Sequence, residues 1–200
     1  MAITFNIPAQ TQSDEFKLLV NKAVEDLHSG AIVVMPSDTL YGIFTPFRED
    51  LVKKLHLVKK RPMSKPFLLV LPESYPLEEF INLDLLTKEM KLHIQKFWPG
   101  RNTLLLPKKS ELFYPLGDSI ALRKPSKQDN AFFYTVLNTY GKPLLAPSLN
   151  VHRDAPLSRL DDMIRIFGND VHTIFFDDFF MPGMASQIWD LTGKSISRLR

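Results

Sequence analysis

Apolar and polar residues alternate along this chain in two rhythms, which predict helices separated by short buried strands. From Ser13 onward, apolar residues recur at helical spacing between Phe16 and Leu27, and Gly30 follows the last turn. The unbroken apolar run from Ala31 to Met35 then predicts a buried strand. The same criteria predict further helices over residues 49–59, 84–98, 131–140 and 160–167, and strands over residues 67–71, 103–106, 119–123, 143–146 and 171–176.

The order of these elements predicts the fold class. Strands alternate with helices, which is typical of α/β proteins, and some strands follow one another closely enough to form hairpins. We therefore expect a twisted mixed sheet flanked by helices. The chain has 200 residues, of which 44% are hydrophobic, and this suffices for one full core without a metal or a disulfide. A single domain over residues 1–200 is the expected organisation.

Composition narrows the function classes. The chain has no cysteine, which excludes disulfides, thiolate metal sites and cysteine nucleophiles, and fits a reducing compartment. No segment approaches the ~20 apolar residues of a membrane span, and the stretch from Met1 to Gln12 does not resemble a targeting signal. We therefore expect a cytoplasmic protein without membrane partners. The net charge of +3 weakly favours anionic partners such as nucleotides or RNA.

Two short polar segments follow apolar strands, where α/β proteins commonly bind ligands. The first, residues 36–42 with sequence PSDTLYG, places Thr39 and Tyr41 two positions apart. The second, residues 146–150 with sequence APSLN, gives Ser148 and Asn150 the same spacing. Because side chains alternate along an extended backbone, each pair should point to one side, toward a shared cavity. Each segment alone is a weak signal, since Ser and Asn are also common in turns.

A cluster of cations lies between a predicted helix and a predicted strand, in residues 59–66 with sequence KKRPMSKP. Lys59, Arg61 and Lys65 could grip nucleotide phosphates, because Arg offers a planar fork and Lys a mobile point charge. The same residues could instead be surface cations that favour the helix dipole. Arg123, at the end of another predicted strand, is either a clamp for a carboxylate or a surface arginine.

Other common site patterns are missing from the sequence. The five histidines have no metal-ligand spacing, so no resident metal site is expected. The Walker-type phosphate loop, the G-x-G-x-x-G fingerprint and the G-x-S-x-G nucleophile elbow are all absent. Any chemistry must therefore rest on oxygen and nitrogen groups outside these motifs.

Taken in order, these segments resemble the YrdC-type threonylcarbamoyl-AMP synthase family. Residues 36–42 match its P-T-[DE]-T-x-Y-G motif except that Ser37 replaces Thr, and residues 59–61 and 148–150 match its K-x-R and S-x-N elements. The motifs F-W-P-G-x-x-T, R-x-P and S-T-V-V-D-L-T-G…L-R are matched by residues 97–103, 123–125, and 186–193 with 199–200. The resemblance covers nearly the whole chain, from about Gly30 to Arg200.

The resemblance implies an α/β fold with a deep, positively lined cavity and a reaction with ATP. L-threonine and bicarbonate or CO2 would form a carbamate, which attacks the α-phosphate of ATP and releases pyrophosphate. The product, threonylcarbamoyl-AMP, would serve a downstream tRNA threonylcarbamoyl transferase machinery. Mg2+ is expected to accompany the nucleotide.

The resemblance also implies a role for each matched site residue. By this analogy the threonine-binding residues are Thr39, Arg123 and Ser186, the ATP-binding residues are Arg61, Lys65, Ser148, Asn150 and Arg200, and the catalytic residues are Lys59, Arg61 and Asn150.

Several positions depart from the family pattern. Residues 151–154 replace the usual Ser-Gly after S-x-N, Gln187 and Trp189 replace smaller residues, and Arg101 with Asn102 replaces the common Pro-Leu. These changes could reshape the nucleotide mouth, and Trp189 could block it. The alternative function is an RNA-binding module without synthase activity, in which the cations of residues 53–65 and 123–127 bind tRNA or rRNA phosphates weakly.

Overall fold

The computed structural model describes residues 1–115, 117–181, 183–193 and 195–200. Most of its strands are short. They are β1 (Ile3–Asn6), β2 (Val33–Pro36), β3 (Tyr41–Pro46), β4 (Leu69–Val70), β5 (Asn102–Pro107), β6 (Ser119–Arg123), β7 (Leu144–Leu145), β8 (Thr173–Phe176), β9 (Gln187–Asp190) and β10 (Ser197–Arg198).

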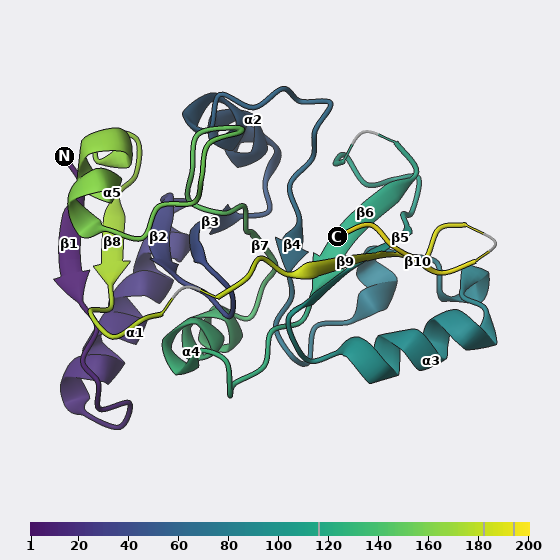
Figure 1. Ribbon diagram of the computed structural model, residues 1–200, viewed down its shortest axis with the longest axis horizontal. Helices are drawn as coiled ribbons and strands as arrows, with labels where there is room; N and C mark the ends of the chain where they lie inside the picture. The colour runs from purple at the N-terminus through teal and green to yellow at the C-terminus, as the bar shows by residue number, and fades with distance from the viewer. Residues whose placement is uncertain (116, 182, 194) are drawn as a thin grey trace.

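Within the described residues, these strands form one sheet in the order β1-β8-β2-β3-β7-β4-β6-β5-β9-β10 (Figure 1). The pairs β1·β8, β2·β8, β4·β6 and β5·β9 are parallel, whereas the remaining pairs are antiparallel. The predicted α/β class with a mixed sheet is therefore confirmed.

Three of the described α-helices begin at a side chain that accepts a hydrogen bond from a free backbone N–H group. The helices are α1 (Asp14–His28), α2 (Glu49–Val58), α3 (Lys88–Phe97), α4 (Ala131–Tyr140) and α5 (Leu160–Phe167), with short 3-10 turns η1 (Leu77–Glu79) and η2 (Leu83–Leu85). Ser13, Thr87 and Asn130 cap α1, α3 and α4, whereas α2 and α5 have no such cap, and Gly141 ends α4 with a φ of 73°. None of the helices described is long and apolar enough to cross a bilayer.

Alternation along the strands divides the core between the two faces of the sheet. Val33 belongs to a core cluster that contains residues of α1 and α4, whereas its neighbour Val34 belongs to a second cluster that contains residues of α2, α3 and α5. Each fully buried aliphatic side chain contributes about 1.5–3 kcal/mol. The two cores hold the sheet rigid, and the loops at the strand ends are therefore supported from both sides.

The structure corrects several predicted elements. The sequence does not predict β1, β9 or β10, whose side chains are mostly exposed or half-buried. It also predicts no strand at β3, although β3 follows the turn directly. The third helix begins at Lys88 and not at residue 84, because the Thr87 side chain accepts a hydrogen bond from the Met90 N–H at 3.2 Å.

Candidate active site

A cavity of about 470 Å³ lies where the turn between β2 and β3, the loop after α2, the segment after β7 and the C-terminal residues meet. All of the predicted site residues except Lys65 line it: Thr39, Lys59, Arg61, Arg123, Ser148, Asn150, Ser186 and Arg200. Its charged lining residues are Lys59, Arg61, Arg123, Arg153, Arg200 and Asp154. A cavity of this size suits a small-molecule ligand, and its excess of cations suits an anion.

The turn between β2 and β3 is built around the hydroxyl of Ser37. Its Oγ accepts hydrogen bonds from the backbone N–H groups of Thr39 (3.1 Å) and Leu40 (3.2 Å), and donates one to the Leu40 carbonyl (2.6 Å). A serine therefore supplies the bonds this turn needs, and Thr39 follows at the cavity wall. The motif ends in Gly42 because a Cβ there would lie 2.5 Å from the ring of Phe44.

Tyr41 does not offer its hydroxyl to the cavity, contrary to the predicted pairing with Thr39. The hydroxyl donates to the Asp177 carbonyl (3.1 Å) and accepts from the Asp177 N–H (3.0 Å). The ring is buried against Phe176 and Phe180. Tyr41 therefore fastens the segment after β8 to the start of β3.

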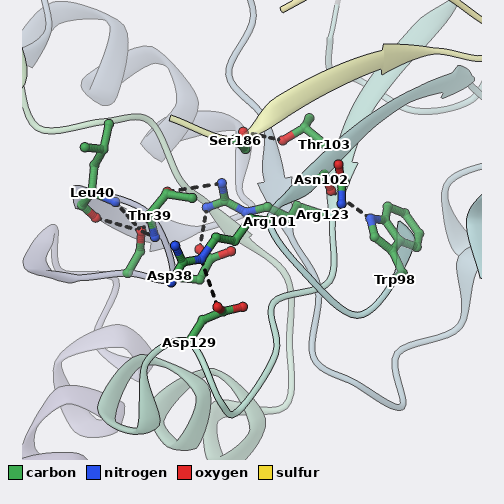
Figure 2. Close-up of polar contacts among 11 residues, drawn as sticks. Asp38, Thr39, Leu40, Trp98, Arg101, Asn102, Thr103, Arg123, Asp129 and Ser186 are labelled. Carbon is green, nitrogen blue, oxygen red and sulfur yellow. Dashed lines mark hydrogen bonds and ion pairs between the residues drawn. The ribbon is translucent and has the colours of Figure 1, made fainter. Parts of the chain in front are cut away.

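Arg123 at the end of β6 is a buried cation in the cavity wall and not a surface arginine. Its Nη2 lies 3.0 Å from Asp38 Oδ1, with the two side chains 4% and 0% exposed (Figure 2). Its Nη1 lies 3.5 Å from Thr39 Oγ1. Burial raises the pKa of Asp38, and the Arg123 charge opposes that rise. The arginine thus lies between a carboxylate behind it and the cavity in front.

Lys59 turns inward at the end of α2. It is 2% exposed, and its Nζ donates to the carbonyls of Ser148 (2.5 Å) and Asn150 (2.6 Å) and to Asn150 Oδ1 (3.1 Å). Lys59 keeps a helical backbone conformation as the C-cap of α2, and the chain changes direction after it, where Lys60 adopts a left-handed φ of 49°. Burial, and then the nearby Arg61 charge, lower the pKa of Lys59 to about 7.

Arg61 also faces the cavity, held by the loop that follows it. Its Nε donates to the Lys65 carbonyl (2.6 Å) and its Nη2 to the Pro66 carbonyl (3.0 Å). The guanidinium lies over the ring of Phe67, with Cζ 5.3 Å from the ring centroid. Lys65 contributes its carbonyl to this arrangement, while its side chain is exposed and lies outside the cavity lining. The basic segment is therefore partly a cavity wall and partly a surface.

Two buried residues support this loop from behind, and sequence reasoning did not find them. His56 Nδ1 lies 2.9 Å from the Arg61 carbonyl, so that nitrogen carries the proton. The hydroxyl of Tyr114 lies 3.3 Å from His56 Nε2 and accepts from the Phe67 N–H at 2.5 Å. Burial lowers the pKa of His56 and raises that of Tyr114 to about 12. Both side chains are therefore uncharged, and both support the loop through hydrogen bonds to its backbone.

The side chains of Ser148 and Asn150 point to the same side, as expected from their spacing. Ser148 Oγ donates to Asn150 Oδ1 at 2.7 Å. The Asn150 amide nitrogen donates to the carbonyls of Val151 and Asp154, each at 2.8 Å. Together with the bonds from Lys59, these contacts fix the orientation of the amide and place both side chains on the cavity wall.

The C-terminal segment closes the remaining side of the cavity. Ser186 Oγ lies 2.9 Å from Thr103 Oγ1 (Figure 2), and Arg200 Nε donates to the Ser186 carbonyl at 3.1 Å. Trp189 lies outside the lining, stacked on Phe97 at 4.6 Å. It therefore does not block the cavity, contrary to one expectation from the sequence.

The departures at Asn102 and Trp189 fit one another. Trp189 Nε1 donates to Asn102 Oδ1 at 3.2 Å, and Trp98 Nε1 donates to the Asn102 carbonyl at 2.8 Å. One residue thus accepts from both indoles, which join α3 to β9. This contact stabilises the sheet edge beside the cavity.

Three further residues at the site were given no role by sequence reasoning. Asp38 and Thr103 lie within the matched motifs, and this position in the sequence could have marked them as site residues. His152 lines the cavity, its Nε2 is buried without a partner among the described residues, and no pattern in the sequence marks it. Among the described residues, no group of three His, Asp or Glu side chains lies close enough together to hold a metal ion.

Comparison with known proteins places this fold and site in a family. Residues 25–200 match the Sua5/YciO/YrdC family model, described as Telomere recombination. The threonylcarbamoyl-AMP synthase of Aliivibrio fischeri is 29% identical over 182 residues, which cover 88% of this chain and 97% of that protein. The corresponding protein of Vibrio vulnificus is 23% identical over 183 residues, with 90% and 97% covered.

Solved structures show the same fold. P. abyssi Sua5 complexed with L-threonine is 22% identical with a TM-score of 0.82, and the match covers 100% of this chain and 57% of that longer one. E. coli YciO is 20% identical with a TM-score of 0.81, and the match covers 100% and 95% of the two chains. Because the family model spans most of the sequence and its motif residues surround one cavity, this chain belongs to the Sua5/YciO/YrdC family.

Proposed function

We propose that this protein synthesises threonylcarbamoyl-AMP from L-threonine, bicarbonate or CO2, and ATP. The observation that carries the proposal is the convergence of Lys59, Arg61 and Asn150 with Thr39 and Arg123 around one cavity. Relatives named threonylcarbamoyl-AMP synthase, aligned along 88–90% of the chain, support the same conclusion.

Threonine fits the end of the cavity formed by Thr39, Arg123 and Ser186. The Arg123 guanidinium supplies a fixed positive charge for the amino acid carboxylate. The Ser186 hydroxyl, already bonded to Thr103, offers a polar contact opposite it. Because Arg123 is nearly inaccessible to water, its attraction for a carboxylate is screened less than that of a surface arginine.

ATP would bind to the remaining cations of the cavity wall. Arg61 and Arg200 are available for phosphate oxygens, and burial lowers the pKa of each guanidinium. Ser148 and Asn150 add neutral hydrogen-bonding groups to the cavity wall. Lys65 is exposed at the surface, so its predicted phosphate contact requires its side chain to turn toward the cavity.

The proposed chemistry needs positioning and charge, and no protein nucleophile. The threonine amine, after losing a proton, adds to CO2, and the nitrogen's second proton leaves as the carbamate forms. A carbamate oxygen then attacks the α-phosphorus, and the bond from that phosphorus to the bridging oxygen breaks to release pyrophosphate. Binding of the reactants in one cavity would hold the short-lived carbamate beside its target. Lys59, with a pKa of about 7, can hold or release a proton near neutral pH at this centre.

Mg2+ would neutralise phosphate charge during this reaction. Asp154 is the carboxylate among the lining residues, and one carboxylate suits a cation held mainly by phosphates and water. The product would pass to the tRNA threonylcarbamoyl transferase machinery in the cytoplasm. tRNA itself would then bind weakly, because the cavity cations serve ATP.

The test is pyrophosphate release from ATP. Release should require both threonine and bicarbonate, and Arg61→Ala or Asn150→Ala should lower turnover ~10²–10³-fold, as for loss of one contact to a developing charge. Arg165→Ala, which removes an exposed arginine of α5, is the matched control and should leave turnover unchanged. Equal release without an amino acid would refute the assignment. ATP-insensitive tRNA binding with no pyrophosphate release would favour the RNA-binding alternative.

A further inference from the structure

The carboxylate of Asp38 is an unusual group for its position. Its side chain is 0% exposed, and neither oxygen has a hydrogen-bond partner among the described residues. Its neighbours Ser37 and Thr39 line the cavity, whereas Asp38 points behind the wall. Burying a carboxylate with so few donors is unfavourable unless a paired charge compensates. That charge is Arg123, at 3.0 Å.

Arg123 in turn has few other contacts that could fix its orientation. Its Nε is buried without a partner in the described part of the chain, and its bond to Thr39 is long at 3.5 Å. The guanidinium is therefore oriented mainly by its attraction to Asp38. A planar arginine recognises a carboxylate well only when its donors are aimed at it.

A second ion pair lies at the outer side of the first. Arg101 Nε is 2.8 Å from Asp129 Oδ1, with the side chains 52% and 21% exposed (Figure 2). Both charges act on Asp38: after burial and Arg123, Asp129 raises its pKa, and Arg101 lowers it to a smaller extent. A Cβ on Gly183 would lie 3.4 Å from Arg101 Nη1, and the Gly183 N–H donates to the Thr39 carbonyl at 2.8 Å. The outer pair therefore lies against the turn that carries Asp38.

We propose that Asp38 is a positioning residue, which aims Arg123 at the carboxylate of the amino acid substrate, and that the Arg101–Asp129 pair supports it from outside. This inference rests on the proposed function for the identity of the substrate. Asp38 touches no substrate itself and acts through Arg123. Its loss should therefore weaken amino acid binding selectively and leave ATP binding nearly intact.

The first experiment measures the dissociation constants of L-threonine and ATP separately by calorimetry for Asp38→Asn. A misdirected charged hydrogen bond should raise the threonine constant about 10-fold or more. The ATP constant should change by less than about 3-fold. Asp26→Asn is the matched control, because Asp26 is also a buried carboxylate with a cationic partner, in its case a lysine. Asp26 accepts a hydrogen bond from Thr173 at 2.7 Å and lies away from the cavity. Unchanged threonine affinity in folded Asp38→Asn, or equal loss for both ligands, would overturn the proposal.

A second readout needs no substrate. Guanidinium NMR, with the Arg123 signal assigned by its loss in Arg123→Lys, should show hindered rotation in the wild-type protein and free rotation in Asp38→Asn. If the wild-type protein binds no threonine but the NMR change occurs, the proposed function fails and the positioning role stands. Persisting hindrance in Asp38→Asn would contradict the positioning role.

If Asp38→Asn does not fold, the outer pair supplies the test, because exposed residues tolerate substitution. Asp129→Asn and Arg101→Gln each break the exposed ion pair that lies against the turn, and each should raise the threonine dissociation constant by about 2–5-fold, as expected for the loss of such a pair. ATP affinity and unfolding temperature should stay unchanged. No effect on threonine binding in both variants would overturn the inference.

Discussion

The inward turn of Lys59 predicts an unusual dependence of stability on pH. Folding lowers the pKa of this lysine from 10.5 to about 7, because burial disfavours the ammonium. Between these two values the unfolded chain therefore binds more protons at Lys59 than the folded protein does. The free energy of unfolding should then rise with pH across this window, and Lys59 should add no slope well below about pH 7.

The size of the effect follows from the two pKa values. Each pH unit inside the window contributes at most ~1.4 kcal/mol, and the integrated rise from about pH 7 to about pH 9 is about 2 kcal/mol. No discount for solvent screening is needed, since the side chain is 2% exposed. In Lys59→Met this slope should vanish. The variant also loses three hydrogen bonds, but that loss changes the free energy of unfolding by the same amount at every pH in the window.

The assay is urea unfolding followed by tryptophan fluorescence at several pH values in this window. The wild-type free energy of unfolding minus that of Lys59→Met should grow by about 2 kcal/mol from about pH 7 to about pH 9. Lys54→Met, which removes an exposed lysine from the same helix, controls for the loss of one charge. Lys124, whose pKa is also lowered by burial, cancels in the difference. A difference that stays constant across the window would refute the argument from burial.

Three further substitutions test the packing around the site. Tyr114→Phe should destabilise the protein by about 1–3 kcal/mol in urea unfolding, because the buried Phe67 N–H loses its acceptor. Trp189→Phe should lower stability by about 1 kcal/mol through the lost bond to Asn102, with the KM for threonine unchanged because the indole lies outside the cavity. Gly42→Ala should lower the unfolding temperature by several degrees, about 2–4 °C per kcal/mol, since its Cβ would meet an aromatic ring at 2.5 Å.

The periodicity of apolar residues predicted those helices and strands that have one face buried and the other exposed to solvent. The helices α4 and α5 and the strand β6 begin and end where the pattern places them, because their apolar positions face a core directly. The strands β9 and β10 carry no such signal, since Gln187 and Ser197 are exposed. The strand β9 pairs with β5, which is far away in the sequence, and β10 then pairs with β9.

The candidate site could be predicted as a set of segments and not as a geometry. Polar residues after strands mark positions that can face a cavity, and Thr39, Ser148 and Asn150 do so. Which cations of a charged cluster face inward depends on the tertiary contacts available to each one, such as those of Lys59 with Ser148 and Asn150, and composition does not report these contacts. Lys59 is buried at the end of α2, whereas Lys65 nearby remains at the surface.

The place of Arg200 has a practical consequence for handling the protein. Its side chain lines the cavity, and its backbone N–H and carbonyl both bond to Ile188 in β9. Any residues fused after Arg200 therefore begin at the edge of the cavity, where a histidine-rich purification tag would compete with the cavity cations for phosphates. Met1 precedes β1 at the opposite edge of the sheet (Figure 1). Affinity tags and surface immobilisation should accordingly use the N-terminus, and inactivity of a C-terminally tagged preparation would say little about the native enzyme.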